Sequence, residues 1–454
     1  MDPLGPLKQT LSGMRERHLE ELARLVRIPS VSAQGTGIRE AAEATASLLE
    51  ARGMAVQIHE TAGNPVVTAS CGAAEGPTLL FYEHYDVQPP DPLELWTAPP
   101  FDVTERDGRL YGRGTADTKG HLVCRLAAID AVREVFGGDP VAYKFVVEGE
   151  EEVGSPNLAS FLEEHAADLT ADGCLWEFGG VDFDGRPVIW LGLKGIVCLE
   201  LEAKVPDFDA HSSLGAVIDN PLYRIAAAIA SLRDVDGRVT VDGFYDDVDK
   251  LSDSDLQVIA AAPDHTERIA ATYGVQRLLG GSSGAQTARR LEAEPCLNVN
   301  GITGGYGGPG TKTVLPSRAS AKLDIRLVPS QSPERVVTLV REHLARKGFS
   351  DVAVSADSGE QPGRTPVDDP FVQLVIGAAR QAYGLEPVVA LSSPGSGPAH
   401  PFREFLKVPF ASAGCGYPGS RAHSPDEHIR VSDFESGKLH TALVIAALAR
   451  PGRE

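Results

Sequence analysis

The segment TLLFYEHYD, residues 78–86, and the segment GTADTKG, residues 114–120, decide the fold class of this chain. The first begins with an apolar run that is typical of a buried strand, and it ends near His84. The second places Asp117 in a glycine-flanked loop, and the apolar periodicity after it predicts a helix. In α/β proteins, ligands and catalytic groups gather outside the carboxyl ends of the strands. We therefore interpret His84 and Asp117 as metal ligands that the rest of the chain supports.

Length and composition restrict the class of protein. A chain of 454 residues is too long for one ordinary core, so two domains are expected. The net charge of −21 argues against nucleic acid or an anionic membrane as a partner. No apolar run approaches the roughly 20 residues of a membrane helix, and no signal peptide is visible. The cysteines are scattered, which suits a reducing compartment. We therefore expect a cytoplasmic protein that binds neither nucleic acid nor membrane.

Strand and helix patterns divide the chain into three stretches. Residues 1–195 alternate between buried strands and helices, which predicts an α/β domain with a mixed, mostly parallel sheet. In residues 196–362 the strands alternate strictly between apolar and polar residues, as in Ala321–Leu327, which is typical of a sheet with one solvated face. Strand–helix alternation returns in residues 363–454. The predicted fold is thus an α/β catalytic domain interrupted by an inserted α+β domain with an open-faced sheet.

Histidines and acids recur at the strand ends of the predicted α/β domain. Zinc and similar ions bind imidazole nitrogen and carboxylate oxygen, and catalytic sites keep one position open for water. Taken singly, these residues have ordinary explanations: Asp117 could cap the helix that follows, and Glu150–Glu152 could be a solvated turn. Their recurrence at one edge of the sheet favours a metal site. The candidate ligands are His84, Asp117, Glu152, Glu177 and His423.

A series of short motifs runs in order through nearly the whole chain. They are His84–Pro89 with Trp96, Gly108–Gly114 with Asp117 and Lys119–Gly120, Glu148–Ser155, Lys194–Gly195, His211–Ser212, Asn220–Pro221, Gly395–Ser396 and His423–Pro425. In these motifs the chain resembles the M20 metallopeptidases, which include carnosinase-like dipeptidases, carboxypeptidase G-type enzymes and N-acyl amino acid deacylases. The spacing of these motifs resembles that of the dipeptidases. The resemblance implies that the inserted domain is a lid and dimerisation domain.

The resemblance also implies a site with two divalent metal ions in each subunit. Asp117 would bridge the ions. His84 and Glu177 would complete the coordination of one ion, and two further residues, Glu152 and His423, that of the other. Two ions about 3.5–4 Å apart clamp a bridging hydroxide and polarise the scissile carbonyl group. Zinc is expected, and manganese or cobalt would suit the same ligands.

Two acids beside the ligands receive roles from the same resemblance. Glu151 would be the general base that deprotonates the attacking water and then protonates the leaving amine. Asp86 would accept a hydrogen bond from the far ring nitrogen of His84 and so fix its tautomer. A turn at the end of the strand is the alternative role of Asp86.

The inserted domain contributes candidate residues as well. By resemblance, His211 reaches the active site of the partner subunit in a homodimer and stabilises the oxyanion. Arg326 and Ser396 bind the carboxylate of the substrate, a task that suits a guanidinium group. Without the resemblance, His211 would be a polar edge residue and Arg326 a solvated one.

Three residues depart from the family pattern. Glu83 stands where the family usually has glycine, so an additional acid lies beside the first ligand and either alters metal affinity or faces outward. Thr118 stands where many members have an acid, and Glu177 where carnosinase-like members have aspartate. The role of Glu83 is left open by the sequence.

We predict an enzyme, a dinuclear metallohydrolase that cleaves the amide bond of dipeptides or other small peptides. An N-acyl amino acid deacylase on the same scaffold is the first alternative. A non-catalytic, metal-stabilised binding protein is the second, and the presence of every ligand position and of Glu151 argues against it. The expected partners are a small peptide or N-acyl amino acid substrate and a second copy of the chain.

Overall fold

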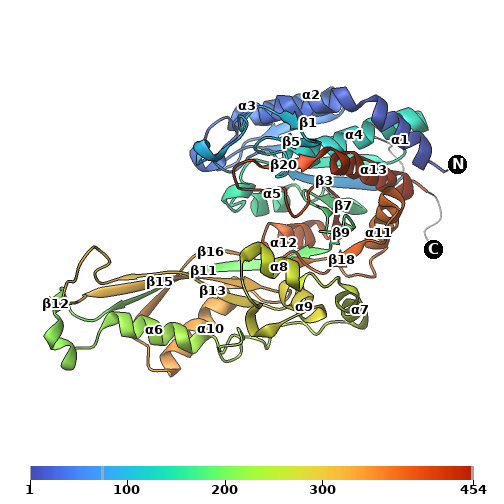
Figure 1. Cartoon of the computed structure of the whole chain (residues 1–454). Helices are drawn as coiled ribbons and strands as arrows, with labels where there is room; N and C mark the ends of the chain where they lie inside the picture. Colours follow the sequence, from blue (N-terminus) through green and yellow to red (C-terminus); the bar gives the residue numbers. More distant parts are fainter. Residues whose placement is uncertain (1, 73–75, 451–454) are drawn as a thin grey trace. The chain divides into compact units, whose positions relative to one another are not determined.

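The computed structural model describes residues 2–72 and 76–450, and the chain divides into two compact units (Figure 1). The first unit consists of Met1–Gly192, Arg364–Leu391 and Pro401–Glu454, and the second of Leu193–Gly363 and Ser392–His400. Each unit has its own main sheet and is described in turn. The boundaries expected from the sequence are those of domains that fold independently, one of which dimerises. They stay a prediction.

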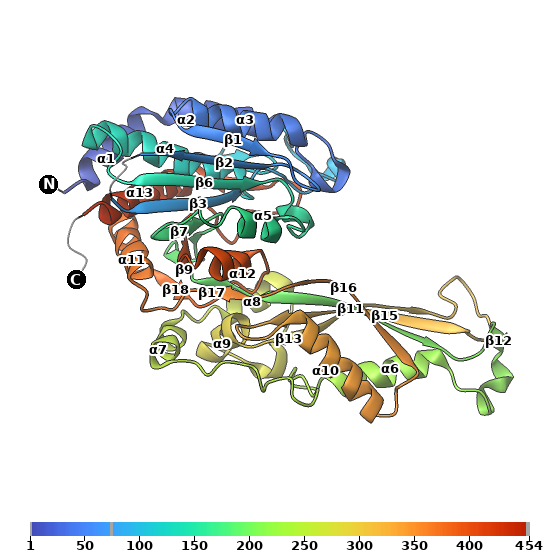
Figure 2. The same cartoon turned by 180° about the vertical axis from the view of Figure 1, so that it is seen from behind.

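A six-stranded sheet forms the centre of the first unit (Figure 2). Its strands, in spatial order, are β1 (Ala55–His59), β2 (Val66–Cys71), β6 (Ala142–Glu148), β3 (Thr78–His84), β7 (Gly173–Trp176) and β19 (Phe410–Ser412). β3 is parallel to β6 and β7, and β7 is parallel to β19, whereas β1 and β2 are antiparallel to their neighbours. The prediction of a mixed, largely parallel sheet is confirmed.

Helices pack against this sheet from both sides. Because side chains alternate along a strand, Tyr82 contacts the ring of Phe402, with centroids 4.8 Å apart, while its neighbour Glu83 meets Arg125 of α4 on the other face. His84 therefore lies on the face opposite to α4. The main helices of this unit are α1 (Leu4–Gly13), α2 (Arg15–Val26), α3 (Ile38–Glu50), α4 (Lys119–Phe136), α5 (Leu158–Glu164), α11 (Pro370–Tyr383), α13 (Val431–Leu448) and the π-helix η6 (Phe402–Leu406).

Helix α4 begins directly after the loop that carries Asp117. It is the helix predicted from the apolar periodicity, and its first four turns are almost entirely buried. It ends at Gly137, which adopts a left-handed conformation with φ of 75° that favours glycine. Thr118 occupies the N-cap position, and no side chain caps the first turn. The alternative role of Asp117 as a helix cap is therefore not observed.

Two small sheets complete the first unit. The first contains β20 (His428–Arg430), β5 (Arg109–Tyr111) and β4 (Thr104–Arg106), and the second β18 (Val388–Ala390), β9 (Pro187–Trp190) and β8 (Gly180–Val181). The antiparallel pairing of β20 with β5 matters for the site. It brings the segment just before β20 beside the loop that follows β5, although these two parts of the chain are far apart in sequence.

The second unit is built on a four-stranded antiparallel sheet. One face packs on α6 and α10, with residues such as Leu323 and Ile325 buried in a common core. Full burial of each such side chain stabilises the fold by about 1.5–3 kcal/mol. On the other face Lys322 is exposed and Arg326 half-buried, so the predicted one-sided sheet is confirmed. The strands are β13 (Cys296–Gly304), β15 (Arg318–Leu327), β11 (Gly195–Lys204) and β16 (Val352–Glu360), and the helices α6 (Pro221–Leu232) and α10 (Pro333–Arg346).

The remaining elements of the second unit are short. They include the strand pair β12 (Ala210–His211) and β14 (Val314–Leu315) and the helices α7 (Asp253–Ala261), α8 (Thr266–Tyr273) and α9 (Ala285–Ala293). Within the residues that the structure describes, no helix combines the length and apolar character needed to span a bilayer. The expected cytoplasmic location stays a prediction.

Candidate metal centre

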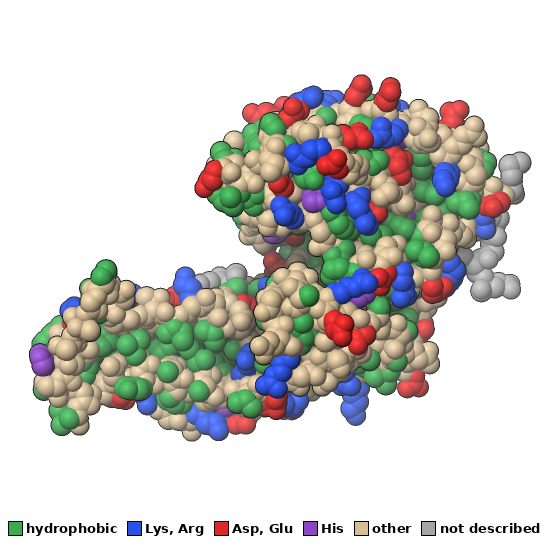
Figure 3. All heavy atoms as spheres, in the orientation of Figure 1, with side chains coloured by type: hydrophobic (Ala, Val, Ile, Leu, Met, Phe, Trp, Pro, Cys, Tyr) green, Lys and Arg blue, Asp and Glu red, His purple; other side chains and the backbone are tan. Residues whose placement is uncertain are grey.

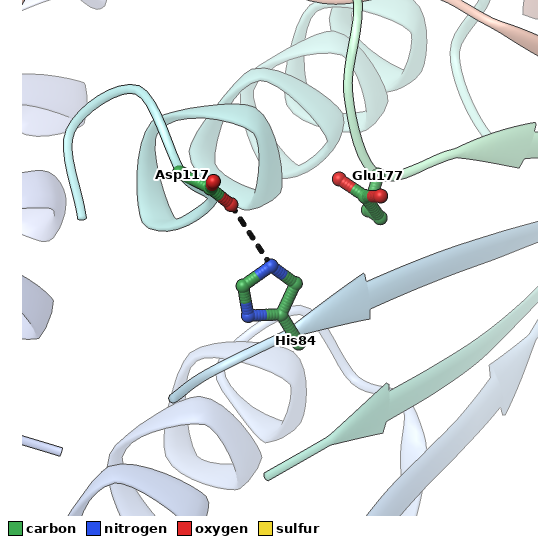
Figure 4. Close-up of side chains that lie close together, drawn as sticks. All are labelled: His84, Asp117 and Glu177. Carbon is green, nitrogen blue, oxygen red and sulfur yellow. Dashed lines mark hydrogen bonds and ion pairs between the residues drawn. The ribbon is translucent and has the colours of Figure 1, made fainter. Parts of the chain in front are cut away.

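Three candidate ligands of the first unit meet at the carboxyl ends of β3 and β7 (Figure 4). His84 is the last residue of β3 and is buried, and Glu177 directly follows β7. Asp117 lies in the loop before α4, with its Oδ1 3.1 Å from Nε2 of His84. One ligand atom from each of these residues lies within 4.8 Å of the others. This spacing is suited to a metal ion.

Asp117 also belongs to a second group of candidate ligands, together with Glu152 and His423. Nε2 of His423 lies 2.9 Å from Asp117 Oδ2 and 3.2 Å from Glu152 Oε2. The two carboxylate oxygens of Asp117 therefore face different imidazole rings, that of His84 and that of His423. The structure thus brings all the candidate ligands together around one shared carboxylate.

The loop that carries Asp117 is held by Glu427, which the sequence analysis did not single out. Its buried carboxylate accepts hydrogen bonds from the backbone N–H groups of Gly114, Ala116 and Asp117, at 3.1, 2.8 and 3.0 Å. The second oxygen of Glu427 accepts a hydrogen bond from Arg113 at 2.6 Å. Because 310 residues separate Glu427 from Asp117, no local sequence pattern signals this contact.

Glu151 lies beside the first group of ligands, in the short 3₁₀ helix η3 (Glu151–Val153). Its Oε2 is 4.0 Å from Nε2 of His84. Burial raises the pKa of Glu151 well above its usual value; His84 opposes this shift, and neighbouring carboxylates reinforce it. The side chains of Glu150–Glu152 are buried or half-buried, so the alternative interpretation of this run as a solvated turn is not supported.

Asp86 contacts the candidate ligand His84 and also the backbone of a second candidate ligand, Glu152. Nδ1 of His84, the ring nitrogen that faces away from Asp117, lies 3.1 Å from the backbone oxygen of Asp86 and 3.3 Å from its Oδ1. Asp86 Oδ2 accepts a hydrogen bond from the backbone N–H of Glu152 at 3.1 Å. Gln88 adds a hydrogen bond from its side-chain amide to Oε2 of Glu152, at 2.9 Å. These contacts fix the directions of His84 and Glu152.

The charges of this site are suited to a cation. Burial by itself would lower the pKa of His84. Hydrogen bonds with carboxylates, of which that of Asp117 has the largest effect, outweigh burial and raise this pKa well above its usual value. Hydrogen bonds with Asp117 and Glu152 raise the pKa of His423 to about 10. Burial raises the pKa of Glu177 well above its usual value. Crowded carboxylates need a positive partner to ionise together. With two imidazole rings, they form a donor set that fits zinc and similar ions.

The candidate residues of the second unit lie on its surface or on the open face of its sheet. Arg326 of β15 donates a hydrogen bond from Nη1 to Oγ of Ser396 at 2.6 Å, so these two predicted residues are in contact. His211 is exposed at the end of β12. Its Nδ1 accepts a hydrogen bond from the backbone N–H of Ser213 at 3.2 Å. In the neutral ring the proton is then on Nε2, which can act as a donor.

Glu83 is completely buried, so it does not face outward. Its Oε1 accepts a hydrogen bond from Nε of Arg125 at 2.8 Å. Its Oε2 lies 3.4 Å from the hydroxyl oxygen of Thr118. Two of the departures noted in the sequence, Glu83 and Thr118, are therefore in contact with each other.

Comparisons with known proteins agree with one another. The model of the family described as Peptidase family M20/M25/M40 matches residues 80–446. A beta-Ala-His dipeptidase from Homo sapiens is 30% identical over 448 residues, which cover 94% of this chain and 85% of that protein. A Cys-Gly metallodipeptidase from Schizosaccharomyces pombe is 26% identical, with 96% of each chain covered. The crystal structure of an M20 family metallo-carboxypeptidase from Sulfolobus solfataricus superposes with a TM-score of 0.89 at 37% identity, covering 95% of this chain and 99% of that one.

Proposed function

Because this chain belongs to peptidase family M20/M25/M40, and is thus an enzyme that hydrolyses peptide bonds, we propose that it is a dinuclear metallo-dipeptidase. Its substrates would be dipeptides or other small peptides, in keeping with the dipeptidase names of its relatives. The observation that carries the proposal is the position of Asp117, whose two oxygens face His84 and His423 at 3.1 and 2.9 Å. A carboxylate between two such groups is expected of a bridging ligand.

We assign the ligands to the two ions as follows. His84 and Glu177 would hold one ion, Glu152 and His423 would hold the other, and Asp117 would contribute to both. The ions, which we propose to be zinc with manganese or cobalt as alternatives, would supply Lewis-acid activation of the scissile carbonyl and of water.

Glu151 is the proposed general base. It takes the proton of the attacking water and passes it to the amine of the departing residue, so that one side chain serves both proton transfers. Its place beside His84, in the half-buried turn η3, supports this role. Asp86 is proposed to orient His84 through Nδ1, as the distances of 3.1 and 3.3 Å suggest.

The second unit is proposed to recognise the substrate. The guanidinium group of Arg326 donates to the hydroxyl group of Ser396, and its Nε lies 3.5 Å from Asp324 Oδ2. Its remaining N–H groups suit a terminal carboxylate. His211 would donate from Nε2 to the oxyanion of the tetrahedral intermediate. Because the ring is exposed, it is available to a second subunit.

We further propose that the chain forms a homodimer through the second unit. Figure 3 shows hydrophobic side chains along the visible face of this unit. β13 is an edge strand of its sheet, and an uncovered edge can pair with another strand. The exposed hydrophobic residues of the unit include Phe208, Val217, Tyr223 and Ile302. Sedimentation that finds a fully active monomer would contradict the dimer and the role of His211 in a second active site.

A release assay over a panel of dipeptides and N-acyl amino acids tests the proposed function. Dipeptides should be cleaved, a chelator should abolish cleavage, and Zn²⁺, Mn²⁺ or Co²⁺ should restore it. Two ions should be bound for each chain. Preferred cleavage of the N-acyl amino acids would identify a deacylase instead, and a metal content near one ion would argue against Asp117 as a bridge.

A further inference from the structure

Arg125 of α4 is fully buried in the first unit, and its guanidinium group contacts three neighbouring strands at their carboxyl ends. Nε donates to Glu83 at the end of β3, at 2.8 Å. Nη2 donates to the carbonyl oxygen of Trp176 at the end of β7, also at 2.8 Å. Nη1 donates to the carbonyl oxygen of Ala413, which follows β19, and to Thr441 of α13. One side chain therefore connects three strand ends to two helices.

The residues that Arg125 contacts are chain neighbours of the proposed ligands. Glu83 and Trp176 directly precede the ligands at the ends of β3 and β7. Thr118, which directly follows Asp117, lies 3.4 Å from Glu83 and donates a hydrogen bond to the carbonyl oxygen of Glu177 at 2.7 Å. Every ligand of the first proposed ion thus has a neighbour in this network.

Stability alone does not account for this ion pair. Both side chains, Glu83 and Arg125, are 0% exposed, and desolvation offsets much of the attraction between two buried charges. Apolar side chains of similar volume often stabilise a core equally well. They cannot, however, bind the carbonyl oxygens of Trp176 and Ala413 in fixed directions. The pair therefore fixes the orientation of the backbone at the strand ends.

We propose that Glu83 and Arg125 form a positioning pair that sets the spacing of the ligands His84, Asp117 and Glu177 for a divalent ion. This inference rests on the proposed metal centre. Neither member of the pair contacts the reacting atoms, and both act through the backbone next to the ligands. Loss of residues that orient metal ligands typically costs 10–100-fold in metal affinity.

The test is a titration of the metal-free, full-length protein with Co²⁺, followed by calorimetry and by the absorption spectrum of the bound ion. The variant Glu83→Leu/Arg125→Met removes both charges and should bind one of its two ions about 10–100-fold more weakly, with a changed spectrum. Arg125→Lys keeps the charge but loses the planar fork of donors, and it should weaken the same ion. The lysine variant keeps the test decisive if the double variant does not fold.

A matched control exists in the same unit. Arg52 and Asp130 form another buried ion pair, with Nη2 and Oδ2 2.7 Å apart and side chains 1% and 8% exposed. None of the proposed ligands is bonded to either residue among the described contacts. Arg52→Met/Asp130→Leu should therefore change the unfolding temperature and leave Co²⁺ affinity within about twofold.

Metal binding by the wild-type protein and by the variants distinguishes an error in the positioning pair from an error in the proposed metal centre. If the wild-type protein binds no divalent ion at these ligands, the proposed metal centre is wrong. If the wild-type protein binds two ions and both Glu83→Leu/Arg125→Met and Arg125→Lys bind them equally tightly, the metal centre stands and the positioning pair is overturned.

Discussion

The two units place most of their candidate residues in different surroundings, although His423 of the first unit is exposed. In the first unit, His84 and Glu177 are buried at the ends of strands whose sheet is covered on both faces. In the second unit, His211 is exposed and Arg326 is half-buried on the open face of its sheet. Ligands need fixed spacing, which a packed strand end provides, whereas groups that meet a substrate or another subunit need an accessible surface. The following predictions test this division, from the largest expected effect to the smallest.

The largest effect is expected in the first unit, at Glu151. Glu151→Gln should lower kcat by about 10²–10⁴-fold, because an amide cannot accept the proton of the attacking water. The number of bound ions should stay the same. The neighbouring Glu150, whose Oε2 accepts a hydrogen bond from Asn157, provides the control: Glu150→Gln should leave kcat nearly unchanged. Full activity of Glu151→Gln would contradict its role as the base.

The next effect concerns the loop of Asp117. Glu427→Gln removes the charge that accepts three backbone hydrogen bonds, so metal affinity should fall by about 10–100-fold. Calorimetry with Zn²⁺ measures the loss. Glu435→Gln, which affects a carboxylate paired with Lys438, should leave the affinity unchanged. Equal affinity in both variants would show that the loop keeps its shape without Glu427.

The second unit should respond through substrate binding. Arg326→Ala should raise KM by about tenfold or more for peptides with a free carboxyl terminus, because a hydrogen bond to a charged group contributes about 1.5–3 kcal/mol. Metal content should not change. Arg318→Ala, at the exposed start of the same strand, is the control. A loss of bound metal in Arg326→Ala would contradict the division between the two units.

The smallest effect is a pH dependence of stability in the first unit. His18 is completely buried, and its ring nitrogens have no hydrogen-bond partner in the described part of the chain. Burial and, to a smaller extent, the charges of Lys438, Arg52 and Arg17 lower its pKa to about 3. The unfolded chain binds a proton at a pH where the folded chain does not. Titration of His18 should therefore lower the free energy of unfolding as the pH drops below about 6.5, by roughly 1.6 kcal/mol between pH 6.5 and pH 5.

His18→Phe should reduce this loss. Urea unfolding followed by tryptophan fluorescence at pH 6.5 and pH 5 measures it, and the signal reports on the first unit because Trp96, Trp176 and Trp190 all lie there. If His18→Phe loses as much stability between pH 6.5 and pH 5 as the wild-type protein does, other groups cause the acid sensitivity.

The sequence allowed the sheet type and the candidate ligands to be predicted, since both depend on local features. An apolar run that ends in His84 and a loop that carries Asp117 are visible within a few residues, and the structure brings both residues together. Glu427 and Arg125 escaped prediction. Glu427 resembles any acid of a loop, and Arg125 lies in an apolar helix where nothing local signals a buried carboxylate partner.

The sequence by itself determined which chemical groups this protein offers and that they stand at strand ends, because residue type and hydrophobic period are local properties. Only the tertiary structure decided how they meet. The shared position of Asp117, the three backbone hydrogen bonds accepted by Glu427 and the burial of Glu83 against Arg125 join segments up to 310 residues apart. Such contacts depend on how helices and strands pack, and buried polar groups then take the partners that packing brings within reach.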